Sequence, residues 1–218
     1  MPGTPHPTLA LLAGGRGTRM GLPKSHLTIA NVPILRHLLA QWSWPGPTLL
    51  ITAPGVERPP AHDLFTAEHV DPVADQGPLR GIHTALTHAT TDTIIVATVD
   101  MPRVTRAHLD HLTTTLATHP TAPALFLHPP FSRDPKGERQ RSPKASAPPR
   151  SPHSPTFEPF PCAVRRPLLL PILTARLARD DLSVRALATE PGVLTLTAPA
   201  DWHADVWTNW NRPDDLRA

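Results

Sequence analysis

The chain has 218 residues, which is enough for one substantial α/β domain and somewhat few for two. Its formal net charge of +3 suits an anionic small ligand, but nucleic-acid binding usually also shows clustered basic faces. The single cysteine, Cys162, excludes an intramolecular disulfide and a cysteine-based zinc site, and we expect it to be a small buried apolar residue. Apolar runs fall short of the roughly 18 residues of a membrane helix, and the run at 9–13 is too short for a signal peptide. We therefore expect a cytoplasmic protein that binds neither nucleic acid nor membrane.

The segment 9–24, LALLAGGRGTRMGLPK, organises the chain. Its apolar start predicts a buried strand. The glycines at 14, 15 and 17 allow a tight turn and close approach of the backbone to a ligand. Cations follow at Arg16, Arg19 and Lys24, with no acidic residue among them. A glycine-rich turn with exposed N–H groups and cations predicts a polyphosphate site.

Two well-known phosphate loops do not match this segment. A P-loop needs Gly-Lys-Ser/Thr, whereas Leu22 and Pro23 here separate Gly21 from Lys24. The dinucleotide fingerprint G-x-G-x-x-G needs its third glycine one residue earlier than Gly21. It also needs an acidic residue about 20 positions on. Pro23 would interrupt the helix that this fingerprint opens.

Strands and helices alternate in the first part of the chain, as in a parallel sheet. Strands are expected at 9–13, 48–52, 68–71 and 93–99, and helices at 34–42, 82–89 and 105–117. The 93–99 run is β-branched and nearly continuous, so we expect it at the centre of the sheet. It stops at Asp100-Met101-Pro102, because proline cannot donate to a strand ladder.

The second part of the chain is interrupted by a segment of different composition. A strand is expected at 124–128, and residues 129–156 are then rich in Pro, Arg and Ser with few large apolar side chains. Such a segment buries too little surface to offset its ordering entropy, so we expect a disordered insertion within a single domain spanning 1–218. Further elements are a strand within 157–164, helical pieces at 167–177 and 182–188, a strand at 193–197, and a turn and short helix at 207–216.

Two aspartates follow predicted strands. Asp71 and Asp100 come where strands end, and open α/β sheets bind ligands outside the carboxyl ends of their strands. A carboxylate held between a buried strand and a proline can bind Mg²⁺, which prefers oxygen ligands shared with substrate phosphates. Aspartate is also common in structural turns of this kind, so the pattern alone leaves Asp100 open as either a Mg²⁺ ligand or a turn residue.

The histidines do not form a metal motif. His108 and His111 share a helical face, but no third ligand of matching context follows, and we expect exposed helix positions. A nucleophilic serine would need a G-x-S-x-G elbow, which the sequence lacks.

Four motifs, taken together, resemble the molybdenum cofactor guanylyltransferase family. They are Leu12-Ala13-Gly14-Gly15 with Arg19-Met20-Gly21 and Lys24, Asp71 with Gly77-Pro78-Leu79-x-Gly81, Val99-Asp100-Met101-Pro102, and Asn209-x-Asn211-x-Pro213-Asp214-Asp215-Leu216. The resemblance implies a Rossmann-like nucleotidyltransferase fold, with a mostly parallel central sheet and helices on both faces. It also implies transfer of GMP from GTP to molybdopterin, with Mg²⁺ as cofactor and pyrophosphate as product.

The resemblance further implies roles for individual residues. It assigns nucleotide binding to Leu12, Ala13, Gly14, Gly15, Lys24, Thr52, Asp71 and Asp100. It assigns catalysis to Arg19, Lys24 and Asp100, and binding of the Mg²⁺ ion to Asp100. Asn209 and Asn211 are expected to bind the pterin substrate. Thr52 stands where the family often has asparagine. Related cytidylyltransferases tend to carry alanine at the position of Gly14, so this glycine favours guanine. The expected partners are the two substrates and proteins that deliver molybdopterin or mature molybdoenzymes, with the chain itself a monomer.

Two other functions remain open from the sequence. One is a cytidylyltransferase or another nucleotidyltransferase that acts on a small phosphorylated acceptor. The other is a non-catalytic nucleotide-binding adaptor with the 129–156 segment as its partner-binding element. Lys24 and Asp100 disfavour the adaptor, because a binding-only protein has less need of both.

Overall fold

A seven-stranded sheet forms the centre of the computed structural model, which describes residues 6–14, 22–130 and 158–210. The strand order is β5-β4-β1-β6-β8-β7-β9. The strands are β1 (Thr8–Leu12), β4 (Thr48–Thr52), β5 (Ala67–Val70), β6 (Thr93–Thr98), β7 (Ala124–His128), β8 (Cys162–Arg165) and β9 (Leu194–Thr197). The sheet has six pairs of neighbouring strands. Four of them are parallel, and only the two pairs made by β8 are antiparallel. The predicted mostly parallel sheet is therefore confirmed.

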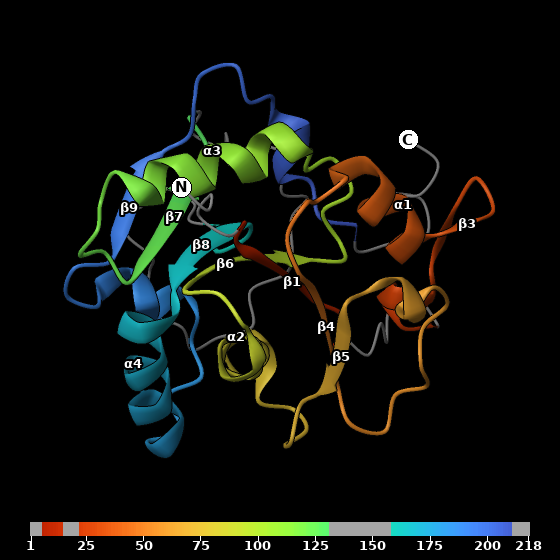
Figure 1. Ribbon diagram of the computed structural model, residues 1–218, viewed down its shortest axis with the longest axis horizontal. Helices are drawn as coiled ribbons and strands as arrows, with labels where there is room; N and C mark the ends of the chain where they lie inside the picture. Colours follow the sequence, from red (N-terminus) through yellow and green to blue (C-terminus); the bar gives the residue numbers. More distant parts are fainter. Residues whose placement is uncertain (1–5, 15–21, 131–157, 211–218) are drawn as a thin grey trace, which may run out of the picture.

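Helices cover both faces of this sheet (Figure 1). They are α1 (Ile34–Trp42), α2 (Gly77–His88), α3 (Arg106–Ala117) and α4 (Arg166–Ala178). Helices α1 and α3 lie over one face, while α2 and α4 lie over the other and contact each other. A two-stranded hairpin, β2 (Thr28–Ile29) with β3 (Val32–Pro33), leads into α1. The fold is thus a doubly wound α/β domain, as the alternating pattern predicts.

Burial explains why the strands read as continuous apolar runs. All five residues of β1 and all five of β4 are buried, because helices cover both faces of the sheet. In α1, the side chains of Ile34, Leu35, Leu38 and Trp42 form the buried face, and the indole N–H of Trp42 donates to the carbonyl of Val104. Cys162 is fully buried, and burial raises the pKa of its thiol, as expected of an unreactive core residue.

Three local predictions need correction. The helical piece expected at 182–188 is present only as a shorter 3₁₀ helix that begins three residues later, η4 (Arg185–Thr189). The strand expected within 157–164 begins only at Cys162. His108 and His111 are not simply exposed, because both rings pack against Trp202, at centroid distances of 4.4 and 5.5 Å.

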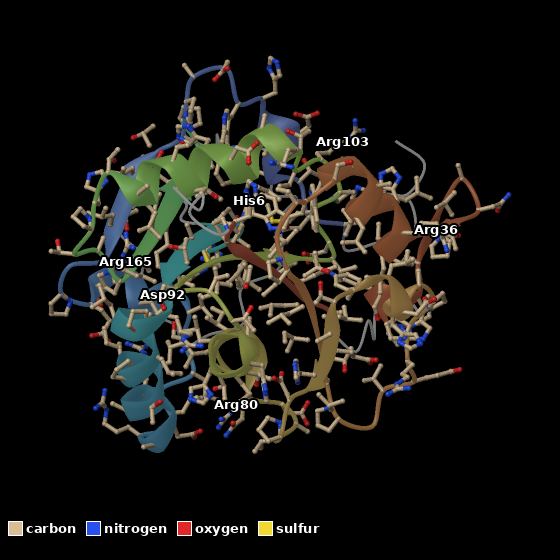
Figure 2. The ribbon with its side chains drawn as sticks, in the orientation of Figure 1. His6, Arg36, Arg80, Asp92, Arg103 and Arg165 are labelled. Carbon is tan, nitrogen blue, oxygen red and sulfur yellow. The ribbon has the colours of Figure 1, made fainter. Side chains whose placement is uncertain are left out.

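The surface carries most of the charged side chains (Figure 2). Arg80, on α2, points away from the sheet, and its Nε donates to Gln76 Oε1 at 2.7 Å. None of the helices in the described parts of the chain has the length and apolar composition needed to cross a membrane. The 129–156 insertion lies almost entirely outside the described residues, so its expected disorder stays a prediction.

Candidate active site

A cavity of about 640 Å³ lies at the edge of the sheet where the parallel strands end. Its walls come from the segments that follow β1, β4, β5 and β6, and from the first turn of α2. Residues 158–160 also contribute, because β8 is antiparallel to β6 and so begins at the edge where β6 ends. This is the edge at which open α/β sheets bind their ligands.

An ion pair between Lys24 and Asp100 lies in this cavity. Lys24 Nζ is 2.8 Å from Asp100 Oδ2, and the two side chains are 17% and 22% exposed. Lys24 is the first residue of the short 3₁₀ helix η1 (Lys24–His26), whereas Asp100 lies two residues after the end of β6. The carbonyl of Asp100 accepts the amide N–H of Trp210 at 2.8 Å, which ties the loop after β6 to the last described residues. The charge of Lys24 is therefore held beside a carboxylate at the centre of the sheet edge.

Asp71 is the second carboxylate that the sequence singles out. Its amide donates to the carbonyl of Thr52 at 2.8 Å, which extends the β4–β5 pairing by one bond. Its Oδ1 accepts the hydroxyl of Thr84 at 2.6 Å. Burial raises the pKa of the Asp71 carboxyl, and the Thr84 hydrogen bond and the nearby Arg80 charge oppose this effect. A partly buried carboxylate with one fixed donor is well placed to accept hydrogen bonds from a ligand.

The first turn of α2 forms another wall of the cavity. Gly77 has φ of +65°, which a side chain would strain, and Pro78 supplies the fixed φ favoured at a helix start. An added Cβ at Gly81 would lie 3.1 Å from Leu12 Cδ2, so the absence of a side chain there lets α2 pack closely on the end of β1. The amino end of this 12-residue helix, with its unpaired N–H groups, thus borders the cavity.

A family model described as "MobA-like NTP transferase domain" matches residues 9–190. The chain belongs to this family. A probable molybdenum cofactor guanylyltransferase from Deinococcus radiodurans is 27% identical over 210 residues, which cover 96% of this chain and 91% of the relative. One from Carboxydothermus hydrogenoformans is 34% identical over 95 residues, or 44% of this chain. That second alignment, like most others with such relatives, spans only about half of the relative's length.

Solved structures agree on the fold. Molybdopterin-guanine dinucleotide biosynthesis protein A from Archaeoglobus fulgidus is similar with a TM-score of 0.67 at 20% identity, covering 96% of this chain and 95% of that one. A 2-C-methyl-D-erythritol 4-phosphate cytidylyltransferase from Thermus thermophilus gives 0.58 at 17% identity, covering 95% and 94%. The predicted Rossmann-like nucleotidyltransferase fold is confirmed.

The MobA-like fold gathers most of the expected site residues around one cavity. Those that line it are Leu12, Gly14, Lys24, Asp71, Asp100 and Asn209. Ala13 and Thr52 do not line it: both are buried, and the carbonyl of Thr52 holds the amide of Asp71. Gly15, Arg19 and Asn211 lie outside the described residues, so their roles stay predictions.

Sequence reasoning gave no site role to five polar residues of the cavity wall, namely Asp75, Gln76, Thr98, Glu158 and Arg185. Gln76 directly precedes the Gly77-Pro78 motif, and this adjacency could have predicted its place at the site. Glu158 and Arg185 stand in no motif, and they reach the cavity only through the antiparallel placement of β8 and the turn η4.

The donor set suits a metal that shares its ligands with a substrate. Within the described ranges, no cluster of three or more His, Cys, Asp or Glu side chains could hold a metal ion. Asp100 keeps one carboxylate oxygen beyond that paired with Lys24, and no other described residue donates to this carboxylate. Mg²⁺ is commonly bound by one or two carboxylates and substrate phosphates, and the hard oxygen of Asp100 fits this pattern.

Proposed function

We propose that this protein is a molybdenum cofactor guanylyltransferase, which transfers GMP from GTP to molybdopterin and releases pyrophosphate. The observation that carries the proposal is the Lys24–Asp100 ion pair in a cavity at the carboxyl edge of the sheet. A cation and a carboxylate held together there provide for both needs of nucleotidyl transfer, a partner for phosphate oxygens and a ligand for a divalent metal. The names of the family relatives support the choice of guanylyl transfer.

The cavity wall supports a guanine nucleotide as the donor. Gly14 adds no side chain to the wall beside β4, which leaves room for a purine. The N–H groups at the start of α2 can donate to a base oxygen, and the Asp71 carboxylate can accept N–H or ribose hydroxyl groups. We place the base and ribose of GTP along β1, β4 and α2.

The reaction forms one bond and breaks one bond at the α-phosphorus of GTP. A phosphate oxygen of molybdopterin attacks this phosphorus, a new phosphoanhydride forms, and the bond to the β-phosphate oxygen breaks, so that pyrophosphate leaves. Lys24 transfers its hydrogen bond from Asp100 to a phosphate oxygen and stabilises the charge that develops there. The attacking phosphate is already ionised, so no side chain has to act as a nucleophile.

Mg²⁺ is the metal that we assign to this site, with Asp100 as its protein ligand. When bound, it supplies positive charge that offsets the negative charge of the phosphates. Asp100 would hold the metal through its carboxylate, and Lys24 would donate to a phosphate oxygen of the nucleotide.

Calorimetric titration with GTP, CTP and ATP, each with and without Mg²⁺, tests the proposal. We expect GTP to bind most tightly, with an enhancement by Mg²⁺ that is lost in Asp100→Ala. Asp63→Ala is the matched control, because Asp63 is exposed and lies outside the cavity wall. Tighter binding of CTP would favour the cytidylyltransferase, and binding of no nucleotide would favour the adaptor.

Release of pyrophosphate when GTP and molybdopterin are mixed with the protein tests the transfer itself. We expect release to require both substrates. A protein that binds GTP but releases no pyrophosphate with molybdopterin would contradict the proposed acceptor.

A further inference from the structure

A polar side chain interrupts the buried face of α1. The residues of this face are Ile34, Leu35, Leu38 and Trp42. Gln41 lies on the same face, because it follows Ile34 by seven residues and Leu38 by three. Helical periodicity favours an apolar side chain at such a position. A half-buried glutamine there breaks the local pattern, and such breaks point to a requirement elsewhere in the fold.

The carboxamide of Gln41 binds the loop that follows β6. Its Nε2 donates to the carbonyl of Pro102 at 2.9 Å and also to the carbonyl of Val104. The indole N–H of Trp42, the next residue of α1, donates to the same Val104 carbonyl at 2.8 Å. This loop passes beside the carboxyl end of α1 on its way to α3 (Figure 1). The end of α1 thus supplies donors to two backbone carbonyls of the loop.

The end of α1 is itself fixed against α3. Arg106, the first residue of α3, donates from Nη1 to the carbonyl of Ser43 at 2.9 Å. The guanidinium carbon of Arg106 also lies 4.9 Å from the centre of the Trp44 ring, in a cation–π contact. Trp42 is fully buried in the core. Gln41 therefore holds the loop from a helix end that is packed in place.

Asp100 lies two residues before the first of these carbonyls. Met101 and Pro102, which follow it, are both buried, and the proline ring fixes φ at Pro102. On the other side, the carbonyl of Asp100 accepts the amide N–H of Trp210 at 2.8 Å. The backbone of Asp100 is therefore held directly by Trp210 and, through Pro102, by Gln41. Because Asp100 and Met101 both line the cavity, a shift of this loop would move the carboxylate within the site.

We propose that Gln41 is a positioning residue for Asp100: by holding the carbonyls of Pro102 and Val104, it sets the place of the carboxylate that binds the divalent metal. This inference rests on the proposed function for the metal role of Asp100. Gln41 is not among the described residues that line the cavity, so it acts through the loop and not on the ligand. Mg²⁺ demands near-octahedral geometry with short bonds, and a small displacement of its protein ligand therefore lowers its affinity.

The dependence of GTP affinity on Mg²⁺ concentration, measured by calorimetry, tests this role without relying on turnover. Gln41→Met keeps the length of the side chain and removes both donors. We expect it to raise the Mg²⁺ concentration that gives half of the enhancement about tenfold, the low end of what loss of an outer-shell partner costs. Saturating Mg²⁺ should restore the GTP affinity, and metal-free GTP binding should stay within about twofold of wild type. Gln41→Glu at pH 8 keeps the shape of the side chain without its donors, and it should shift the Mg²⁺ dependence in the same direction.

Leu35→Val is the matched control for a general loss of stability. Leu35 is buried on the same helix, about 9 Å before Gln41 along the helix axis, so this change loosens the packing of α1 without removing a bond to the loop. We expect it to lower Tm and to leave the Mg²⁺ dependence unchanged. The double variant Gln41→Met/Asp100→Asn should behave as Asp100→Asn alone does, because Gln41 has no effect on the metal once the carboxylate is gone.

The outcomes separate this positioning role from the proposed function. If wild type shows the Mg²⁺ enhancement and both Gln41 variants keep the wild-type Mg²⁺ dependence, the positioning role is wrong and the guanylyltransferase proposal stands. Equal weakening of metal-free and metal-dependent GTP binding in Gln41→Met would overturn the role, because Gln41 would then support the cavity as a whole. A shift of equal size in Leu35→Val would overturn it as well, since lost stability would explain the effect. A wild type without any Mg²⁺ enhancement would overturn the metal assignment, and the positioning role with it.

Discussion

Lys24 Nζ lies 2.8 Å from Asp100 Oδ2, although 76 residues separate the two in the chain. The pair joins the end of the glycine-rich segment to the end of the central strand β6, so that two motifs distant in the sequence act on one ligand. In the proposed reaction each residue has its own partner, a phosphate for Lys24 and Mg²⁺ for Asp100.

Variants of the two residues should therefore differ in their metal dependence. Lys24→Gln should weaken GTP binding about tenfold both with and without Mg²⁺, because it removes a charged hydrogen-bond donor to phosphate. Asp100→Asn should remove the Mg²⁺ enhancement and leave metal-free binding near the wild-type level. Calorimetry with GTP measures both effects. Identical metal dependence in the two variants would contradict the separate roles.

Gly14 offers a test of nucleotide choice. An added Cβ would lie 3.4 Å from the Cβ and the backbone N of Ala53, which is ordinary contact, so Gly14→Ala should fold with little change in Tm. Because the methyl group narrows the wall where we place guanine, the ratio of GTP to CTP affinity should fall about tenfold, in the range that a methyl-sized change in a pocket gives. Competition binding measures this ratio. An unchanged ratio would mean that Gly14 does not select the base.

The sequence predicted the strands well where local signals agree with the tertiary structure. Residues 48–52 and 124–128 form strands with the expected bounds, since each is a buried apolar or β-branched run with proline nearby on at least one side. The position of Asp100 at the site followed from the rule that ligands bind at the carboxyl ends of parallel strands.

The part of the cavity wall beside β8 could not be predicted in this way. Glu158 reaches the cavity because β8 runs antiparallel to its neighbours, and a short apolar run carries no signal of strand direction. Likewise, Arg185 lies on η4, between the residues that Arg176 of the preceding helix holds, namely Asp181, Ser183 and Glu190. Such side-chain contacts between separate segments leave no periodic trace in the sequence.

The partly buried carboxyl of Asp71 should make the stability of the protein depend on pH. Its pKa is higher in the folded protein than in the unfolded chain, so its contribution to stability is present at low pH and is lost as pH rises through the folded-state pKa. Asp71→Asn has no such titration, and its Oδ1 can still accept the Thr84 hydroxyl. The Tm of the variant relative to wild type should therefore be least favourable near pH 4 and increase toward pH 8.

Thermal unfolding of wild type and Asp71→Asn across this pH range provides the measurement. GTP affinity at pH 7.5 should fall in the variant, because a neutral amide accepts hydrogen bonds from the ligand less strongly than a carboxylate. A Tm difference that stays constant with pH would show that the burial of Asp71 has no consequence for stability.

Arg176 should be important for stability because its charge is buried while its two carboxylate partners are partly exposed. Arg176 is 3% exposed and bridges Asp181 and Glu190, whose side chains are 43% and 23% exposed. Arg176→Met should lower the free energy of unfolding by about 1–2 kcal/mol, because it removes charge-assisted hydrogen bonds to carboxylates that are partly exposed and so keep water as a partner. Urea unfolding measures this loss. The double variant Arg176→Met/Glu190→Gln should lose less than the sum of the two single variants, because the second change removes a carboxylate that has already lost its partner. Additive losses would mean that Arg176 and Glu190 do not interact in solution.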